Sequence, residues 1–308
     1  MAIVSGTPRR PDHSAAGAAH REPDIRVDGG RPGPRTDKRA RAIAEAVIAL
    51  RAAGCVFAEE EAAVLGEAAA DDAALSAMVR RRATGEPLEQ VVGYADFCGV
   101  RVRLRPGVFV PRVRSGLLVR LGAETAARRA GAGGGPAIVV DLCCGSGALG
   151  MAVAARAPGS TVHASDRDPA AVACARDNLG ERVYLGDLYR ALPGELRGRV
   201  DVLLANVPYV ATRHMPLLPA EAREHEPPGA LDGGRDGLDV FRRVAAGAPE
   251  WLAPGGVVLS EITEAQVGTA TTVMAASGLA AEVAHDDDLE ATVIIGRRAG
   301  VPGTDPLR

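Results

Sequence analysis

The chain has 308 residues, of which 47% are hydrophobic and 24% charged, so it has room for two domains and a buried core. No apolar run approaches the roughly 18 residues of a membrane-spanning helix, and the first residues lack the apolar stretch of a signal peptide. We therefore expect a cytoplasmic protein with no membrane partner. The five cysteines show neither disulfide-framework nor zinc-ligand spacing, so we expect no bound metal.

The formal net charge of −3 is unevenly distributed along the chain. Residues 1–136 carry 21 Lys and Arg against 16 Asp and Glu, whereas the remaining residues carry 15 against 23. The positive surplus of the first part is small and is more typical of a solvated surface than of a partner-binding surface. The second part is net negative and has no dense basic stripe, which argues against a nucleic-acid substrate.

The first segment, residues 1–36, is rich in Pro, Gly, Arg and Ala without a repeat. This composition predicts a disordered arm, for which a binding role stays open. Apolar residues at helical spacing then predict a small helical domain over 37–84, too small to carry out chemistry alone. Its expected helices span 37–53, 58–69 and a third segment from Asp71 or Asp72 to about Ala83.

A linker follows the helical domain, after the break at Pro87. Short apolar pieces, including Val91-Val92 and Val108-Phe109-Val110, are typical of extended chain. Residues 85–120 are therefore predicted to form a β-hairpin linker, with a further helix beginning near its end, at about 115–130.

From Ile138 to about residue 298, strands and helices alternate. This alternation predicts an α/β domain over 121–298 with a mostly parallel sheet, followed by a tail at 299–308. No helix separates the last two strands, at 280–284 and 291–296, so one of them should run antiparallel. The other expected strands are 138–142, 161–165, 183–185, 200–205 and 257–262, and the expected helices are 148–156, 169–178, 238–252 and 264–277.

Polar signals follow successive strands of this domain. The first strand ends in the loop Asp141-Leu142-Cys143-Cys144-Gly145-Ser146-Gly147, whose small residues let backbone N–H groups approach a ligand, although a plain turn has similar residues. Asp166 and Asp187 end the next two strands. Because ligands bind beyond the carboxyl ends of parallel strands, this repeat favours ligand binding over helix capping. For Asp168, just before Pro169, we expect a helix cap.

The segment Asn206-Val207-Pro208-Tyr209 follows the fourth strand and distinguishes methyl transfer from hydride transfer, which the loop and the acids do not. With this segment, the sequence resembles the class I S-adenosylmethionine-dependent methyltransferases, whose amino- and amide-methylating members carry Asn/Asp-Pro-Pro-Tyr here. The resemblance implies a Rossmann-like, seven-stranded sheet and S-adenosylmethionine as cofactor. The cofactor contacts that it implies are Asp141, Cys143, Gly145, Gly147, Asp166, Asp187 and Asn206.

Four further pieces resemble the protein-(glutamine-N5) methyltransferases that modify peptide-chain release factors, namely 85–88, 93–94 with 97–99, 107–112 and 226–239. The resemblance covers about residues 37–298. It implies methylation of the side-chain amide nitrogen of a glutamine in a release factor or another protein, and we expect a monomer. The catalytic residues that it implies are Asn206, Pro208 and Tyr209, which bind the acceptor together with Val207.

An amide nitrogen is a weak nucleophile because its lone pair is delocalised into the carbonyl. The Asn206 side-chain oxygen and the Val207 carbonyl are expected to accept the two amide N–H bonds and aim the nitrogen at the methyl group. Tyr209 is expected to pack on the planar amide. No general base is required before transfer, so catalysis is expected to come mainly from positioning.

The sequence departs from the family pattern at three places. Val207 replaces the first proline of the motif, Cys143-Cys144 replaces Gly-Thr, and Arg114-Ser115-Gly116 replaces Glu-Thr-Glu. Cys143 carries a steric cost if its position requires a positive φ. Together the departures predict a divergent paralogue of the family.

The acceptor therefore stays open at this stage. The alternatives are an exocyclic amine of a nucleic acid, which the same pocket would hold as a flipped base, a small-molecule amide, or a non-catalytic protein that only binds S-adenosylmethionine. Residues 224–226, in the later segment, are expected either to gate the substrate or to carry plain surface charge.

Overall fold

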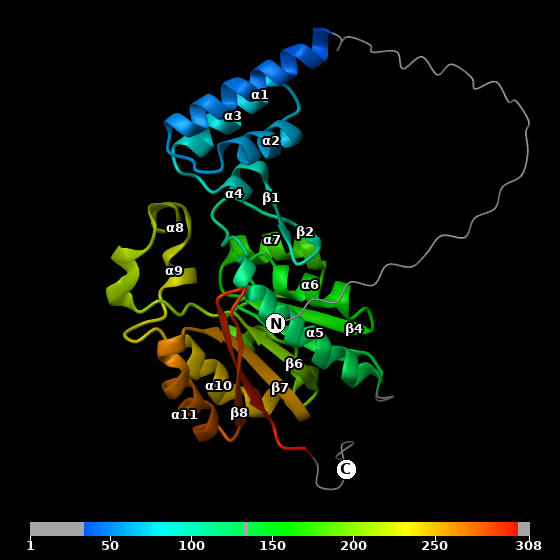
Figure 1. The fold of residues 1–308 in the computed structure, drawn as a ribbon. Helices are drawn as coiled ribbons and strands as arrows, with labels where there is room; N and C mark the ends of the chain where they lie inside the picture. Colours follow the sequence, from blue (N-terminus) through cyan, green and yellow to red (C-terminus); the bar gives the residue numbers. More distant parts are fainter. Residues whose placement is uncertain (1–33, 132–134, 301–308) are drawn as a thin grey trace, which may run out of the picture.

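A computed structural model describes residues 34–131 and 135–300 (Figure 1). The predicted disordered arm lies outside these ranges up to residue 33, but its last three residues, 34–36, belong to the first helix, which corrects the boundary. The predicted tail lies outside them from residue 301. Within the described ranges, no helix combines the length and the apolar character needed to cross a membrane.

The three predicted N-terminal helices are confirmed as α1 (Pro34–Ala52), α2 (Ala58–Ala68) and α3 (Asp72–Ala83). Their apolar faces meet in a separate small core in which Leu50, Leu65 and Leu75 are buried. Asp71 caps α3 by accepting a hydrogen bond of 2.8 Å from the Ala74 N–H. In Figure 1 these helices lie at one end of the molecule, joined to the rest by a short hairpin.

The linker contains the predicted hairpin, β1 (Tyr94–Phe97) paired with β2 (Val100–Arg103), but one extended piece was predicted wrongly. Val91-Val92 belongs to the helix α4 (Leu88–Val92), which Pro87 precedes and Gly93 ends with a φ of +80°. Local turn residues thus override the strand preference of valine. Val108-Phe109-Val110 joins no sheet.

The sheet of the α/β domain has seven strands in the order β5-β4-β3-β6-β7-β9-β8, as expected. The first five in sequence are parallel, and β9 pairs antiparallel with both β7 and β8, which confirms the antiparallel prediction. The strands are β3 (Ala137–Leu142), β4 (Ser160–Asp166), β5 (Val183–Leu185), β6 (Val200–Ala205), β7 (Leu252–Ile262), β8 (Ala280–Asp286) and β9 (Ala291–Arg297).

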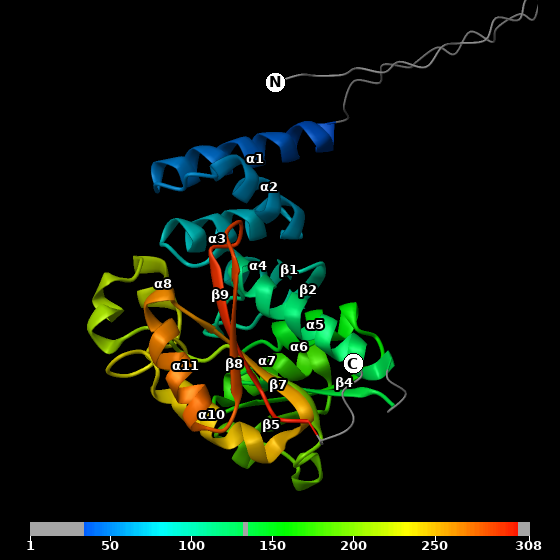
Figure 2. The same ribbon diagram turned by 60° about the horizontal axis from the view of Figure 1, so that its bottom comes forward.

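Helices cover both faces of this sheet (Figures 1 and 2). One face packs on α5 and α6 and the other on α10 and α11, each over its own apolar core. Phe241 and Trp251 of α10 are 1% and 2% exposed. The covering helices are α5 (Gly116–Gly131), α6 (Ala148–Arg156), α7 (Pro169–Leu179), α10 (Asp239–Trp251) and α11 (Val267–Ala276).

The residues Pro254-Gly255-Gly256, which are typical of a turn, lie within β7. Leu252 already pairs with Val200, and the pairing resumes at Val257 after an irregularity, so the turn residues form a bulge rather than a break.

Several short helices join the larger elements, and the segment between β6 and α10 holds three of them, which the sequence did not predict. They are η4 (Thr212–Leu217), α8 (Ala220–His225) and α9 (Pro228–Leu231), and the others are the 3-10 turns η1 (Val113–Ser115), η2 (Leu188–Ala191), η3 (Gly194–Leu196) and η5 (Glu264–Gln266).

Candidate active site

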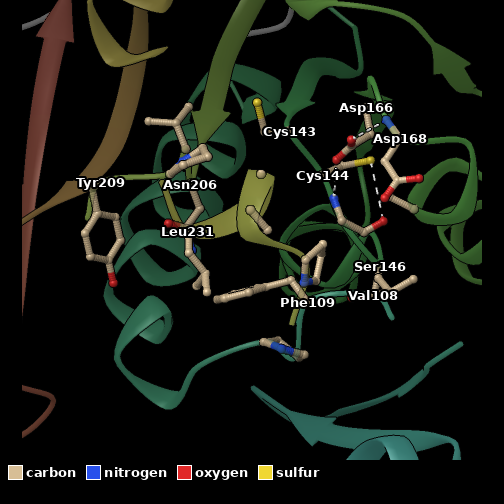
Figure 3. A pocket seen from close by; sticks show the side chains of 18 of the residues that line it. Val108, Phe109, Cys143, Cys144, Ser146, Asp166, Asp168, Asn206, Tyr209 and Leu231 are labelled. Atoms are coloured by element: carbon tan, nitrogen blue, oxygen red, sulfur yellow. Dashed lines mark hydrogen bonds between the residues drawn. The ribbon is translucent and has the colours of Figure 1, made fainter. Parts of the chain in front are cut away.

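A cavity of about 800 Å³ lies at the carboxyl ends of the parallel strands. Its walls come from the loops after β3, β4, β5 and β6, from the linker, and from the segment that carries α8 and α9. Figure 3 shows Asn206 between two ends of this cavity, with Asp166 and Ser146 toward one end and Tyr209 toward the other. The volume is at the upper end of what small-molecule sites usually have, so both a cofactor and part of an acceptor fit.

The loop after β3 has a left-handed backbone at three positions. The φ angles of Cys143, Gly145 and Gly147 are +55°, +56° and +78°. The expected steric penalty at Cys143 is therefore real, and an L-residue in this conformation costs about 1–2 kcal/mol. Cys143, Gly145 and Ser146 line the cavity, and Gly147 caps α6 behind them.

Asp141 lies behind this loop and does not line the cavity. Its side chain is completely buried, and one carboxylate oxygen accepts a hydrogen bond of 3.0 Å from the Gly150 N–H in the first turn of α6. The other oxygen has no hydrogen-bond partner among the described residues. Burial, with a smaller contribution from the nearby Asp166, raises the pKa of Asp141 to about 7. Its contacts fit the loop-orienting role better than direct contact with a ligand.

Asp166 lines the cavity at the end of β4 and also holds the loop. One of its oxygens accepts the Gly145 N–H at 3.0 Å and the other accepts the Asp168 N–H at 2.9 Å. Burial raises the pKa of Asp166. Asp168 accepts the Ala170 N–H at 2.8 Å, which confirms it as the cap of α7.

Asp187 follows β5 and forms an ion pair with Arg243 of α10, and both residues line the cavity. The two acids predicted at strand ends are therefore brought to one cavity, although Asp187 is already engaged by a guanidinium group.

The other end of the cavity is built by the segment after β6. The Asn206 side-chain nitrogen donates to the Ser115 hydroxyl at 3.1 Å, and Val207 is 2% exposed. The Tyr209 hydroxyl donates to a carboxylate oxygen of Glu261 at 2.9 Å and accepts a hydrogen bond from Arg114. Burial and the Glu261 carboxylate raise the pKa of Tyr209, so the phenol stays protonated.

Two residues of this end were not foreseen as functional, Ser115 and Glu261. Glu261 is 2% exposed on β7, and it also accepts hydrogen bonds from Arg114 at 2.8 Å and from Ser115 at 2.6 Å. The signal in the sequence was a lone acid inside the apolar strand Val257–Ile262. The departure from the family pattern at Arg114-Ser115 is visible in the sequence, but the sequence does not indicate that Glu261 is its partner.

The segment with α8 and α9 covers the cavity and is fastened by ion pairs. Glu226, 4% exposed, accepts from Arg112 at 2.6 Å and from the Val110 N–H at 3.4 Å. Glu221 pairs with Arg82 of α3 at 3.2 Å. The plain surface-charge interpretation is therefore wrong for Glu226, while gating stays a prediction.

Within the described residues, no three His, Cys, Asp or Glu side chains are grouped as metal ligands would be. The cavity instead offers a carboxylate at the end of β4, a second at the end of β5, and a tight loop leading to the N-terminus of α6. Hydroxyl and amino donors, rather than a phosphate, suit such acidic walls. An adenosine linked to an amino acid, as in S-adenosylmethionine, fits these groups.

Comparison with known proteins agrees with the fold. Residues 133–221 match the family model described as "Methyltransferase small domain". The catalytic domain of hMettl16, solved with the MAT2A 3′UTR hairpin 6, shares the fold with a TM-score of 0.50 at 12% identity, over 71% of this chain and 81% of that one. The fold and the site define a class I methyltransferase that uses S-adenosylmethionine as methyl donor.

Proteins related to this chain in sequence identify its family within the class I methyltransferases. The release factor glutamine methyltransferase of Geobacter sulfurreducens is 35% identical over 233 residues, 74% of this chain and 78% of the relative. The one from Streptomyces coelicolor is 40% identical over 200 residues, 64% and 70% of the two chains. The 4-amino-L-phenylalanine/4-methylamino-L-phenylalanine methyltransferase of Streptomyces pristinaespiralis is 38% identical over 208 residues, 65% and 69%. The chain belongs to the release factor glutamine methyltransferase family, which confirms the predicted membership and the enzyme class.

Proposed function

We propose that this enzyme methylates the side-chain amide nitrogen of a glutamine in a protein, with a peptide-chain release factor as the first candidate. The names of the relatives support the acceptor. The observation that carries the proposal is Asn206, whose side-chain nitrogen is engaged by Ser115 while the residue lines the cavity. Its amide oxygen is thereby left for an N–H of the acceptor.

In the proposed reaction, S-adenosylmethionine supplies the methyl group as an electrophile on its sulfonium sulfur. Asn206 and the Val207 carbonyl accept the two N–H bonds of the acceptor amide and orient its nitrogen. The new N–C bond forms as the S–C bond breaks, and the proton leaves the nitrogen for solvent only afterwards. Pro208 fixes the backbone between these groups, since its ring restricts φ. Orientation alone contributes about 7–11 kcal/mol in favourable cases.

The cofactor end of the cavity is assigned on the same basis. Asp166 accepts hydrogen bonds from the ribose hydroxyls, and Asp187 receives the adenine amino group after releasing Arg243. The backbone at Cys143 and Gly145 faces the methionine part, with Gly147 and Asp141 supporting the loop from behind. Asn206 adjoins the cofactor and the acceptor.

A second candidate is a small-molecule amine or amide. The Streptomyces pristinaespiralis relative, named for an amino acid with an aromatic amine, matches at 38% identity, between the 35% and 40% of the two release factor enzymes. Arg114 also lines the acceptor end, and its Nη1 takes no part in the contacts to Glu261 and Tyr209, so it can donate to a free carboxylate. A nucleic-acid amine and a non-catalytic role remain outcomes of the same test.

The test is methyl transfer from labelled S-adenosylmethionine to three acceptors in parallel: a purified release factor, 4-amino-L-phenylalanine and a mixed RNA. Peptide mapping locates label in the protein, and cofactor affinity is measured by calorimetry for wild type and Asn206→Ala. Label on the glutamine of the factor's Gly-Gly-Gln loop, lost in the variant while cofactor affinity stays within about twofold, supports the proposal. Label only on the amino acid transfers the proposal to the second candidate. Cofactor binding without any transfer refutes both.

We also propose that the chain divides into an arm that ends before α1 at Pro34, a helical domain up to residue 84, a linker (85–120), a methyltransferase domain (121–298) and a tail (299–308). Because a release factor acts on ribosomes, a cytoplasmic location follows from the proposed acceptor, and we propose that the enzyme acts as a monomer.

A further inference from the structure

We propose that Ser115 and Glu261 are positioning residues that fix which way the Asn206 side-chain amide faces. The inference rests on the proposed function in one respect, namely that the Asn206 oxygen accepts an N–H of the acceptor. The orientation itself is a separate matter, which can be tested without any acceptor.

The direction of the hydrogen bonds at this end of the cavity follows from which side chains have a proton to donate, beginning with Glu261. An ionised carboxylate has no proton and can only accept hydrogen bonds. Arg114 forms an ion pair with this carboxylate and donates to it at 2.8 Å. The Ser115 hydroxyl, 2.6 Å from the other carboxylate oxygen, must therefore be the donor in that contact.

The direction of the hydrogen bond between Ser115 and Asn206 follows from the number of protons on the serine hydroxyl. A serine hydroxyl has one proton, and Ser115 commits it to Glu261. Toward Asn206, at 3.1 Å, Ser115 can consequently only accept, so the amide must present its nitrogen and not its oxygen. The two ends of an asparagine amide have nearly the same shape, and this hydrogen-bond chain is what distinguishes them.

Burial makes this orientation persistent. Ser115 and Glu261 are each 2% exposed, so water cannot easily replace either partner. Tyr209 donates to the same carboxylate at 2.9 Å, which ties the second side chain of the acceptor end to the same anchor. The carboxylate on β7 thus orients two residues of the segment after β6, and the Asn206 oxygen faces the cavity.

The chain offers a direct spectroscopic test because it contains only two asparagines, Asn178 and Asn206. Selective 15N labelling of asparagine gives two side-chain NH2 groups, assigned with Asn206→Ala. Asn178 donates to the Ser146 and Arg103 carbonyls, far from Ser115 in the chain, and is the internal control. Ser115→Thr keeps the hydroxyl, and Ser115→Val has the shape of that threonine without the hydroxyl. Ser115→Ala serves in case these larger residues disturb packing. The fourth variant is Glu261→Gln.

In wild type and Ser115→Thr, one Asn206 NH2 proton is expected to exchange slowly with solvent. In Ser115→Val, Ser115→Ala and Glu261→Gln it is expected to lose this protection, with the Asn178 signals unchanged. Unchanged protection of the Asn206 proton in the Val and Ala variants overturns the orientation, whether or not any acceptor has been found.

The kinetic test uses the acceptor identified under the proposed function. Loss of one hydrogen bond predicts a fall in kcat of about 3-fold to 10-fold for Ser115→Val, with the KM for S-adenosylmethionine unchanged and Ser115→Thr within about twofold of wild type. Loss of protection without a fall in kcat overturns the positioning role alone. If no acceptor is methylated, the proposed function fails and the exchange experiment still decides the orientation.

Discussion

Replacing the buried Asp141 by asparagine is expected to change stability in a way that depends strongly on pH. The carboxyl is completely buried, and it has one hydrogen bond, from Gly150. Burial raises its pKa from an ordinary 3.8 to about 7, so the folded protein holds a proton that the unfolded chain loses.

The direction of the pH dependence of stability follows from this difference in pKa between the folded protein and the unfolded chain. Stability supplied by the neutral carboxyl is present below pH 3.8 and is lost progressively as the pH rises to about 7, above which no more is lost. Between pH 5 and pH 7 the loss amounts to two pKa units, or about 3 kcal/mol, at 1.36 kcal/mol per unit. Asparagine does not titrate. The free energy of unfolding of Asp141→Asn minus that of wild type should therefore be about 3 kcal/mol larger at pH 8 than at pH 5.

The assay is urea unfolding of both proteins at pH 5 and pH 8 without cofactor. Asp96→Asn is the control, because Arg101 lowers the pKa of that exposed carboxyl and it stays ionised throughout this range. The control difference should be the same at both pH values. If the stability difference between Asp141→Asn and wild type is also the same at both pH values, the assignment of a raised pKa to this carboxyl is refuted.

Three further outcomes are expected. Cys143→Gly relieves the left-handed backbone cost of about 1–2 kcal/mol but adds about 0.5–1 kcal/mol of chain entropy, so thermal unfolding should show a net gain of about 0–1.5 kcal/mol; a clear loss contradicts the strain. Arg112→Ala leaves Glu226 buried without its charged partner, and urea unfolding should show a loss of about 3 kcal/mol at pH 8. The loss should become smaller as the pH falls, because burial raises the pKa of this carboxyl and protonation removes its charge; an equal loss at pH 8 and pH 5 argues against burial of a charge. Asp166→Ala removes the acceptor of two loop N–H groups, so calorimetry should show cofactor affinity at least about tenfold weaker, and unchanged affinity removes Asp166 from the cofactor site.

The sequence predicted what depends on local pattern and on the geometry of parallel sheets. Asp166 and Asp187 could be placed in one cavity because the carboxyl ends of neighbouring parallel strands lie at one edge. The strain at Cys143 could be stated in advance because only glycine adopts a left-handed backbone without cost.

What the sequence did not predict depends on contacts between distant segments. The Ser115–Glu261 hydrogen bond joins residues 146 positions apart, which no local periodicity encodes. Asp141 and Gly147 were grouped with the cavity residues because burial behind a loop cannot be distinguished from exposure on it by spacing alone. The helix at Val91 was missed because its flanking Pro87 and Gly93 outweigh the preference of valine.

The position of β9 has a consequence for the biosynthesis of this enzyme. Residues 291–297 are inserted between β7 and β8, although the ribosome makes them after every other strand. Until they emerge, β7 has an open edge and β8 has no partner in the sheet, and such edges promote association between nascent chains. Glu261 lies opposite Val293 in the same pairing, so the strand that anchors the acceptor end is also enclosed last. A chain stopped before Ala291 is therefore expected to aggregate rather than to persist as a shortened methyltransferase.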